Sequence, residues 1–596
     1  MRMRNKPYYG QDRMIDDRFY DESSVHYNVG SMKEIQTEEQ SLQAEVVFNR
    51  FERKSRFSFN LINNPFEPSQ SWTFPPDYED NPSCPLKIDR IRDNCLRLRM
   101  SFSALKQFRY EDESPMLDGT LNFKSDLGSW KEEGQHFIFK TDRMTVCLEK
   151  EPFSLILYDA QGKELSRTLT MEDSRSLMNY SPLPLSYIKS NIDMRRQSAI
   201  SLSIDPDEHF FGCGEHFKEP DKLGQTLNLW TQDPHCSESR EMYKPVPFFW
   251  STRGYGVFIH SGAQMTIDFG AQYSEALTAF LDDDQIDVFF FVGKPKEILN
   301  TYTDLTGKAP MLPIWSFGFW MSRITYQSEA EVREVARKLQ QYEIPCDVIC
   351  LDTGWFEEEW RCNYQFSSRF SDAQQLIQDL RDHGYKVSLW QIPYFTPQNE
   401  FYDELLERGL AVLDADGELI TEDAILDFSN PETVAWYQSK LKTLFDQGVK
   451  VIKTDFGEAA PAKGVYHSGL SGRYEHNLYP IRYNKAASEI TKQETGDSIV
   501  WARSAWAGSQ RYPLHWGGDT EVSNMGMLSV LHGGLSLGNS GFSFWSHDAG
   551  GFAVKSQEEL YRRWLFMSIF TSHIRAHGQP PKEPWYFSDD FLSFFR

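Results

Sequence analysis

The sequence contains few cysteines, and their spacing matches no metal-binding motif. The eight cysteines are scattered, without a CxxC pair or the paired cysteine and histidine spacing of a zinc site. We therefore expect free, mostly buried thiols. The sequence also lacks an apolar run of the roughly 18 residues needed to span a bilayer, and its first residues lead into no apolar stretch typical of a secretory signal. These absences predict a soluble cytoplasmic protein with no membrane partner.

Positive charge is also scarce. The 62 lysines and arginines are outnumbered by 86 aspartates and glutamates, so the net charge is −24. A protein of this charge repels phosphate backbones, and we expect no nucleic-acid partner. Aromatic residues are abundant, at 14%, which suits stacking on sugar rings but equally suits a large β-rich core.

The length and the hydrophobic pattern predict more than one domain. At 596 residues the chain exceeds a single ordinary domain. Between residues 45 and 301, short strand-like runs such as 137–141, 144–149 and 154–158 are broken by turns, which is typical of a β-sandwich. Residues 1–44 are polar and acidic without steady periodicity, and fit either a loosely ordered arm or an edge strand.

After Pro310 the pattern changes to strand-like runs that alternate with amphipathic helices. The first strand is expected at 315–322, and Ser328 with Glu331 forms a capping box that begins the first helix. Further strands are expected at 346–352, 386–393, 449–457 and 498–505, with helices at 372–382 and 431–447. The lack of a GxGxxG or Walker loop, together with acidic residues at strand ends, favours a closed (β/α)8 TIM barrel over an open doubly wound sheet.

Two carboxylates are candidates for catalysis. In the strand-like run 451–457, Lys453 and Asp455 lie two residues apart and hence on one face. The lysine charge keeps the aspartate ionised, as a nucleophile requires. Asp519 follows two glycines that let the backbone turn tightly beside a ligand, and is a candidate general acid/base. Taken singly, the first pair also fits a salt bridge at a strand end, and the second motif an ordinary turn.

Other polar and aromatic residues fall near the ends of predicted strands. Asp352, Trp390, Arg503 and His547 each also fit a core, loop or helix-cap role when taken singly. If they meet at one barrel mouth beside Lys453, they supply hydrogen bonds for sugar hydroxyls and an aromatic wall for the sugar ring.

Four motifs together resemble glycoside hydrolase family 31, and the resemblance is greatest to its bacterial α-xylosidase branch. They are Lys453-Thr-Asp-Phe-Gly-Glu458, Ala502-Arg-Ser504, His515-Trp-Gly-Gly-Asp519 and Phe544-Trp-Ser-His-Asp548. The resemblance implies a retaining α-glycosidase with an oligosaccharide substrate, no metal and no organic cofactor. In it Asp455 would be the nucleophile and Asp519 the acid/base. The residues that would bind the cleaved sugar are Asp233, Asp352, Trp390, Lys453, Arg503, Trp516 and His547.

The sequence departs from the α-xylosidase branch beside the predicted sugar site. Residues 321–327, after the first barrel strand, lack the bulky Phe of that branch, and Thr353 stands where the branch has Cys. The leading prediction is release of non-reducing terminal α-linked xylose by double displacement. An α-glucosidase, another α-hexosidase or a transglycosylase of the same family is the alternative, because one or two side chains can switch such a preference.

The domain prediction follows from the resemblance and the patterns together. We expect an N-terminal β-sandwich domain at residues 1–305 and a catalytic (β/α)8 barrel at residues 306–596. Family members continue past the equivalent of Phe595, so we expect a barrel truncated before its last helix and missing C-terminal β-domains. An inactive carbohydrate-binding fragment is the alternative of another class. The oligomeric state is open, with a homo-oligomer among the alternatives.

Overall fold

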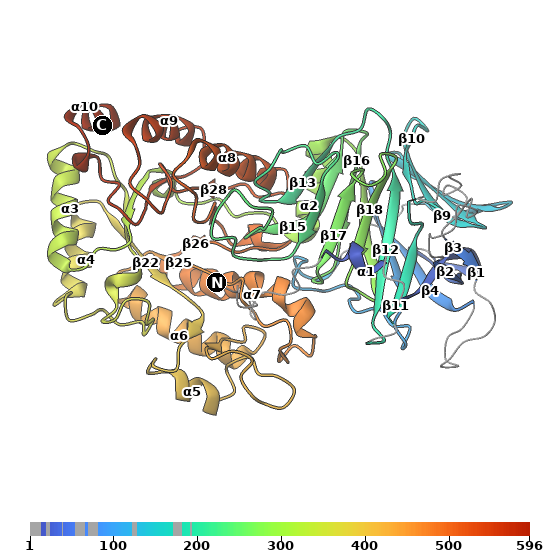
Figure 1. Cartoon of the computed structure of the whole chain (residues 1–596), viewed down its shortest axis with the longest axis horizontal. Helices are drawn as coiled ribbons and strands as arrows, with labels where there is room; N and C mark the ends of the chain where they lie inside the picture. The colour runs from blue at the N-terminus through green and yellow to red at the C-terminus, as the bar shows by residue number, and fades with distance from the viewer. Residues whose placement is uncertain are drawn as a thin grey trace.

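The structure is a computed structural model. It describes residues 14–19, 24–38, 40–53, 66–68, 81–121, 128–170, 182–190 and 193–596. A β-rich part and an α/β barrel lie next to each other along the long axis of the molecule (Figure 1). The β-sandwich and TIM-barrel architecture predicted from the sequence is confirmed.

The β-rich part consists of two antiparallel sheets. The strands of the large sheet are β1 (Ser24–Thr37), β2 (Ser41–Arg53), β3 (Phe66–Pro68), β4 (Ser83–Arg92), β5 (Cys95–Ser101), β11 (Ser186–Ser190), β12 (Arg196–Ser203), β13 (Phe210–Gly214), β14 (Thr226–Leu229), β15 (Pro245–Ser251), β16 (Tyr255–Ile259), β17 (Met265–Phe269), β18 (Ala276–Leu281) and β19 (Gln285–Val292). Their order is β13-β15-β16-β19-β5-β4-β2-β1-β11-β12-β18-β17-β14, with β3 beside β2. The small sheet has the order β10-β9-β8-β7-β6, with strands β6 (Lys131–Glu133), β7 (His136–Lys140), β8 (Met144–Lys150), β9 (Phe153–Asp159) and β10 (Glu164–Arg167).

The two sheets share one hydrophobic core. The same cluster of buried side chains includes Phe139 and Leu155 of the small sheet and Phe289 of the large sheet. Helix α2 (Pro295–Thr306) covers part of the large sheet, where Tyr302 stacks on Phe248 with ring centroids 3.9 Å apart. A short helix, α1 (Asp16–Phe19), precedes the first strand.

Strand β1 corrects the prediction for the N-terminal residues. Within residues 1–44 we expected an arm or an edge strand, but β1 lies inside the large sheet, between β2 and β11. Val25, Tyr27 and Val29 are buried, and so are the polar residues His26 and Asn28 between them. Strand β1 is therefore covered on both faces, which its polar composition did not indicate. Residues 1–13 lie outside the described part of the chain.

Eight parallel strands form the barrel, in the order β28-β27-β26-β25-β22-β21-β20-β29. They are β20 (Phe319–Arg323), β21 (Val348–Leu351), β22 (Lys386–Gln391), β25 (Val451–Thr454), β26 (Val500–Ala502), β27 (His515–Trp516), β28 (Trp545–Ser546) and β29 (Ile574–Ala576). A parallel bridge between Asp548 and Arg575 connects the ends of this sheet and closes the barrel.

Helices follow the barrel strands on the outside. They are α3 (Glu329–Gln341), α4 (Ala373–Asp382), α6 (Pro431–Asp446), α7 (Gly472–Thr495), α8 (Asn524–Gly538), α9 (Glu558–Ser568) and α10 (Asp589–Phe595). The connection from β22 to α6 also contains the pair β23 (Tyr394–Phe395) and β24 (Ala424–Ile425) and the helix α5 (Tyr402–Glu407). Short 3-10 turns are η1 (Ile314–Phe317), η2 (Thr353–Trp355), η3 (Ser509–Arg511) and η4 (Pro584–Tyr586).

Local signals placed several of these elements correctly. Ser328 caps α3 by accepting a hydrogen bond from the backbone N–H of Glu331 at 3.3 Å, and Asn430 caps α6. Gly448 adopts the positive φ of +102° that ends a helix. The first barrel strand is shorter than predicted, because η1 occupies the start of the range 315–322 and β20 begins only at Phe319.

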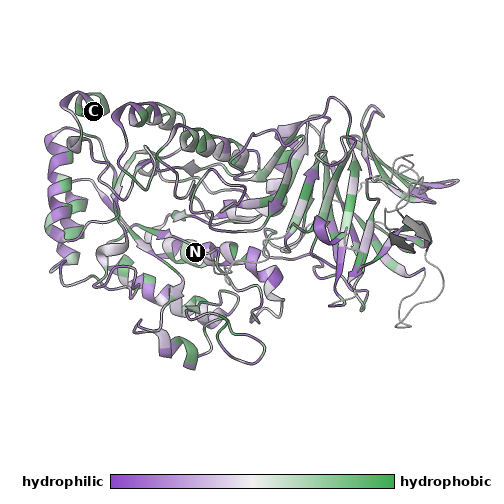
Figure 2. Cartoon of the chain, in the orientation of Figure 1, coloured by the Kyte–Doolittle hydropathy of each residue, from purple (hydrophilic) through white to green (hydrophobic). Residues whose placement is uncertain are grey.

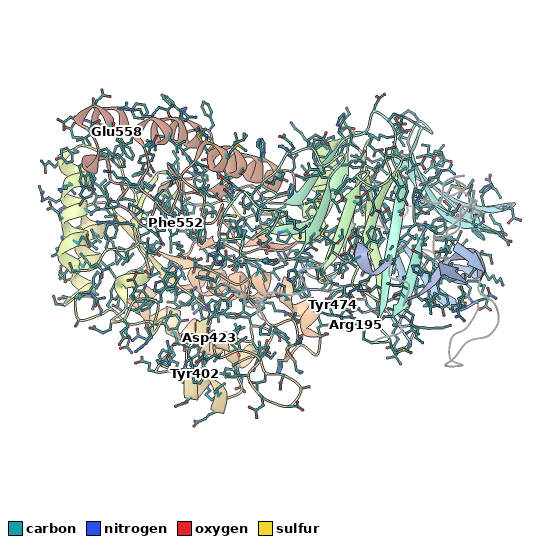
Figure 3. All side chains as sticks on the ribbon, viewed as in Figure 1. Arg195, Tyr402, Asp423, Tyr474, Phe552 and Glu558 are labelled. Carbon is teal, nitrogen blue, oxygen red and sulfur yellow. The ribbon has the colours of Figure 1, made fainter. Side chains whose placement is uncertain are left out.

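Helix α7 joins the barrel to the sandwich. Tyr474, labelled in Figure 3 where α7 meets the sandwich, accepts a hydrogen bond from Arg109 Nη2 at 2.7 Å. Asn477 accepts from the N–H of Thr231 at 2.9 Å and donates to the carbonyl of Gly262 at 3.0 Å. Buried polar groups that are paired across a junction fix the relative position of its two sides. The predicted domain boundary near residue 305 lies between β19 and β20 and stays a prediction.

Figure 2 shows apolar residues along the strands of the large sheet and mixed faces on the outer helices of the barrel. Among the described residues, no helix is both long and apolar enough to cross a membrane. All eight cysteines are free, and six of them are buried. This bears out the expectation of free, mostly buried thiols.

Candidate active site

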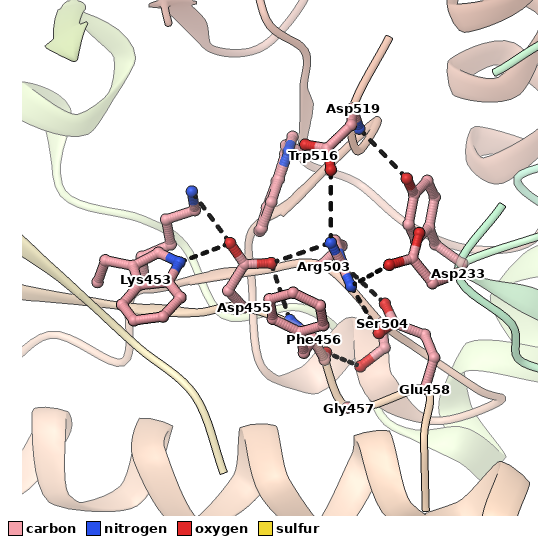
Figure 4. A network of polar contacts seen from close by, with 12 residues as sticks. Asp233, Lys453, Asp455, Phe456, Gly457, Glu458, Arg503, Ser504, Trp516 and Asp519 are labelled. Atoms are coloured by element: carbon pink, nitrogen blue, oxygen red, sulfur yellow. Dashed lines mark hydrogen bonds and ion pairs between the residues drawn. The ribbon is translucent and has the colours of Figure 1, made fainter. Parts of the chain in front are cut away.

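The structure brings most of the predicted site residues to one end of the barrel. The strands carry Asp352 after β21, Trp390 in β22, Lys453 in β25, Asp455 after β25, Arg503 after β26, Trp516 in β27 and Asp519 in the loop that follows β27. Because parallel strands point the same way, these C-terminal ends form one mouth. Figure 4 shows Arg503 between Asp455, Asp519 and Asp233 at this mouth.

Asp455 is a buried carboxylate that contacts four nitrogen atoms. Its Oδ2 accepts from Trp390 Nε1 at 2.7 Å and lies 3.2 Å from Lys453 Nζ. Its Oδ1 accepts from the N–H of Phe456 at 2.8 Å and lies 3.3 Å from Arg503 Nη1. Burial alone would raise the pKa of Asp455, but the charges of Lys453 and Arg503 and these hydrogen bonds lower it to about 2. Asp455 is therefore ionised at neutral pH.

Asp519 occupies the opposite electrostatic setting. Its side chain is 30% exposed, and its Oδ2 lies 3.7 Å from Arg503 Nη1. Burial raises the pKa of Asp519, the charge of Arg503 opposes this effect, and the carboxylates of Asp455 and Asp233 add to it. The resulting pKa is about 7. Asp519 can therefore hold a proton near neutral pH and give it up.

Arg503 connects the acidic residues of the mouth. Its Nη1 contacts both Asp455 and Asp519, while its Nε and Nη2 each donate to Glu458 at 2.9 Å. Its Nη2 also donates to Asp233 at 3.0 Å. Asp233 comes from the sandwich, so the prediction that this part lends a carboxylate to the mouth agrees with the geometry. Glu458 belongs to the quoted motif but was not predicted as a site residue, because sequence alone did not show which arginine it meets.

The shared guanidinium nitrogen limits the distance between the two carboxyl groups. Asp455 Oδ1 and Asp519 Oδ2 can lie no further apart than their two distances to Arg503 Nη1 combined. This limit admits the carboxyl separation of roughly 5–5.5 Å that retaining glycosidases use. The two carboxyl groups therefore lie close together on either side of Arg503 Nη1.

A second set of polar side chains, formed by Lys453, Asp352 and His577, lies beside Asp455. Lys453 Nζ contacts Asp352 Oδ2 at 2.9 Å as well as Asp455. His577, directly after β29, places its Nε2 3.8 Å from the same Asp352 oxygen, and its Nδ1 lies 2.7 Å from Ser322 Oγ. Sequence reasoning missed His577. The signal that could have found it was its place just after the last barrel strand.

The prediction for His547 is wrong. Its Nδ1 accepts a hydrogen bond from Trp564 Nε1 at 3.0 Å, and its Nε2 lies 3.4 Å from Ser568 Oγ. Both partners belong to α9 on the outside of the barrel, so the imidazole faces the helix and not the mouth. The next residue, Asp548, faces inward and forms an ion pair with Arg575. His547 is therefore a buried structural residue, and burial lowers its pKa to about 3.

Tryptophans surround the two carboxyl groups. Trp390 and Trp516 are each 1% exposed, and Lys453 Nζ lies 4.9 Å from the ring centroid of Trp516. Trp360, which was not predicted, is 46% exposed and meets Trp390 edge to face at 5.2 Å. An exposed aromatic ring next to acidic and basic groups suits stacking on a sugar.

The arrangement supports acid/base and nucleophilic chemistry. Two carboxyl groups with pKa values pushed apart are the usual sign of a nucleophile and an acid that act as a pair. In the described ranges, no group of three or more histidine, cysteine or acidic side chains could hold a metal ion.

Comparisons with known proteins give the family context. Residues 309–596 match the model of the glycosyl hydrolases family 31 TIM-barrel domain, and residues 85–268 match that of the glycosyl hydrolase 31 N-terminal galactose mutarotase-like domain. An α-xylosidase from Emericella nidulans is 32% identical over 78% of this chain and 62% of its own length. The α-xylosidase XylQ from Lactiplantibacillus pentosus is 35% identical over 65% of this chain and 53% of its own.

A solved structure agrees on the fold. A GH31 α-xylosidase from a soil metagenome, complexed with xylose, superposes with a TM-score of 0.75 at 22% identity, over 86% of this chain and 81% of that one. The present chain spans less than two thirds of the length of each of these two α-xylosidases.

Proposed function

The chain belongs to glycoside hydrolase family 31, and from this premise we propose that it is a retaining α-glycosidase. Asp455 is the nucleophile and Asp519 the general acid/base of this proposal. One observation carries it: Arg503 Nη1 contacts both carboxyl groups, whose pKa values are about 2 and about 7. These are the protonation states that a nucleophile and an acid need before the reaction begins.

The proposed reaction has two displacements. In the first, an Asp455 oxygen attacks the anomeric carbon while the Asp519 proton passes to the glycosidic oxygen, which leaves as an alcohol. In the second, the Asp519 carboxylate takes a proton from water, and the water oxygen attacks the anomeric carbon and releases Asp455. Lys453 and Arg503 keep Asp455 ionised before the first displacement and stabilise the carboxylate that the second displacement releases. Asp352, Lys453 and His577 offer hydrogen bonds to sugar hydroxyls.

For the substrate, we propose a non-reducing terminal α-linked xylose on an oligosaccharide. The names of the two curated relatives support this choice. The alternative is an α-glucosidase, another α-hexosidase or a transglycosylase. It is favoured by Thr353, which directly follows Asp352 where the α-xylosidase branch has Cys. The Thr353 Oγ1 donates to Glu359 at 2.6 Å. A cytoplasmic location belongs to the same proposal and is supported by the eight free thiols.

The test compares p-nitrophenyl α-xyloside with p-nitrophenyl α-glucoside, with Asp455→Asn as control. We expect faster turnover of the xyloside, a first product that keeps the α configuration by NMR, and a loss on the order of 10³-fold or more in Asp455→Asn. Excess turnover of the glucoside would select the alternative. Full activity of Asp455→Asn would overturn the assignment, and saccharide binding without any turnover would favour a carbohydrate-binding protein.

A further inference from the structure

A short segment of the sandwich contacts the loop that carries Asp519. Tyr243 is fully buried, and its Oη accepts a hydrogen bond from the backbone N–H of Asp519 at 3.4 Å. The Tyr243 ring lies against Gly518, where an added Cβ would overlap its atoms. The carbonyl of Tyr243 accepts from the N–H of Ala505, two residues after Arg503. Tyr243 therefore contacts the acid/base loop and the end of β26 together.

The neighbouring Lys244 holds the start of the same loop. Its Nζ donates to the carbonyl of Trp516 at 2.6 Å and forms an ion pair with Glu215 Oε2 at 2.5 Å. Both side chains are 0% exposed. Glu215 Oε1 in turn accepts from Trp545 Nε1, on the next barrel strand, at 3.3 Å. We call Glu215, Tyr243 and Lys244 the anchor cluster.

Burying an ion pair to hold one carbonyl group costs desolvation free energy. Removing a lysine and a glutamate from water costs several kcal/mol per ion, and well-packed apolar side chains often stabilise a fold as well or better. The ion pair fixes the position of the loop, because the Lys244 ammonium holds the Trp516 carbonyl at one point. Tyr243 fixes Gly518 and the N–H of Asp519. The loop is thus held at Trp516 and again at Gly518 and Asp519, and these contacts determine where the Asp519 carboxyl lies.

We propose that the anchor cluster positions Asp519 for proton transfer to the leaving group. This proposal rests on the proposed glycosidase function and extends it to residues of the sandwich that do not touch the reacting atoms. Proton transfer requires a hydrogen-bond distance between acid and leaving oxygen, and a displacement of about 1 Å can cost on the order of 100-fold in rate. Tyr243, Lys244 and Glu215 are thus positioning residues.

Two changes test the proposal. Tyr243→Phe keeps the ring against Gly518 and removes only the hydroxyl that accepts from Asp519. The double change Lys244→Met with Glu215→Gln removes both charges together, so that neither is left buried and unpaired. Tyr302→Phe is the matched control, because Tyr302 is a fully buried tyrosine of the sandwich that lies on α2. Thermal unfolding of each variant confirms the fold.

The readout is kcat/KM for a series of aryl α-xylosides with leaving groups of graded acidity. Acid catalysis contributes roughly 10²–10⁴-fold for poor leaving groups. We therefore expect Tyr243→Phe to lose about 3–10-fold and the double variant about 10–100-fold on the phenyl glycoside. The loss on the 2,4-dinitrophenyl glycoside should be less than about 3-fold, since that leaving group needs no proton. The alkaline limb of the pH profile should move to lower pH, because a displaced Asp519 is better solvated.

Equal losses on all leaving groups, with an unchanged pH profile, would overturn the positioning role. Wild-type behaviour of Tyr243→Phe on the phenyl glycoside would do the same, even if the double variant fails to fold. Failure of the glycosidase proposal is a distinct result, in which the wild-type chain turns over no aryl α-glycoside at all.

Discussion

At the scale of single residues, two aspartates differ in protonation because their neighbours differ. Four nitrogen atoms contact Asp455, whereas Asp519 contacts the edge of one guanidinium and lies near three other carboxylates. The reaction needs Asp455 ionised and Asp519 protonated. We therefore predict that kcat/KM falls as pH rises through about 7, where Asp519 loses its proton, and falls as pH drops toward about 2, where Asp455 gains one.

The measurement is kcat/KM against pH for the wild type and for Asp519→Asn, with an activated aryl glycoside for the variant. Asparagine does not titrate, so the alkaline limb should vanish in Asp519→Asn. An alkaline limb that persists there would assign the titration to another group.

A hydrogen bond from Trp390 helps to keep Asp455 ionised, in addition to the charges of Lys453 and Arg503. Trp390→Phe keeps a ring in place but removes the donor that lies 2.7 Å from Asp455 Oδ2. Because a hydrogen bond to a charged group contributes about 1.5–3 kcal/mol, we expect kcat/KM to fall about 10–100-fold and the acid limb to move to higher pH. Trp564→Phe is the control, since Trp564 donates to His547. If the control loses as much activity, the outward assignment of His547 is wrong.

At the scale of elements, the loop after β27 depends on backbone freedom at Gly518. Its φ is +71°, and a side chain there would overlap Tyr243. Gly496, at the end of α7, has a φ of +85° but open space around it. We predict that Gly518→Ala and Gly496→Ala each lose about 1 kcal/mol of unfolding free energy from the backbone alone.

The two alanine variants should then differ in activity. Only Gly518→Ala is expected to lose kcat/KM, because only there must the loop that carries Asp519 move. Denaturant unfolding and kinetics on the phenyl glycoside check both variants. Equal kinetics in the two would show that the loop tolerates the displacement.

Short-range patterns predicted the elements better than they predicted which residues face the site. The caps at Ser328 and Asn430 act within one helical turn, so the sequence contains all that determines them. The prediction that His547 faces the site was wrong for a different reason. Successive residues of an extended segment face opposite sides, and directly after β28 a shift of one position exchanges His547 for Asp548 at the inner face. The register of a strand as short as β28 depends on its neighbours in the barrel.

At the scale of the whole molecule, the site is complete only when the sandwich and barrel are held together. Asp233 and the anchor cluster residues Tyr243 and Lys244 come from the sandwich, while Arg503, Trp516 and Asp519 come from the barrel. Sequence motifs indicated Asp233 through the family resemblance, but no local pattern indicated Tyr243 or Lys244. Their partners in the barrel, Trp516 and Asp519, lie more than 250 residues away in the chain, and only the tertiary structure brings them together.

The junction at Asn477 tests this dependence. Asn477→Leu leaves the N–H of Thr231 and the carbonyl of Gly262 buried without their partner, and each unsatisfied group costs about 1–3 kcal/mol. We predict a loss of about 2–6 kcal/mol in unfolding free energy, measured by denaturant titration. Asn300→Leu, at an exposed position of α2, should change stability by less than about 0.5 kcal/mol. Because the sandwich also supplies Asp233, Asn477→Leu should lower kcat/KM even at denaturant concentrations below the unfolding transition. Unchanged kinetics under those conditions would mean that the barrel holds its site without this junction.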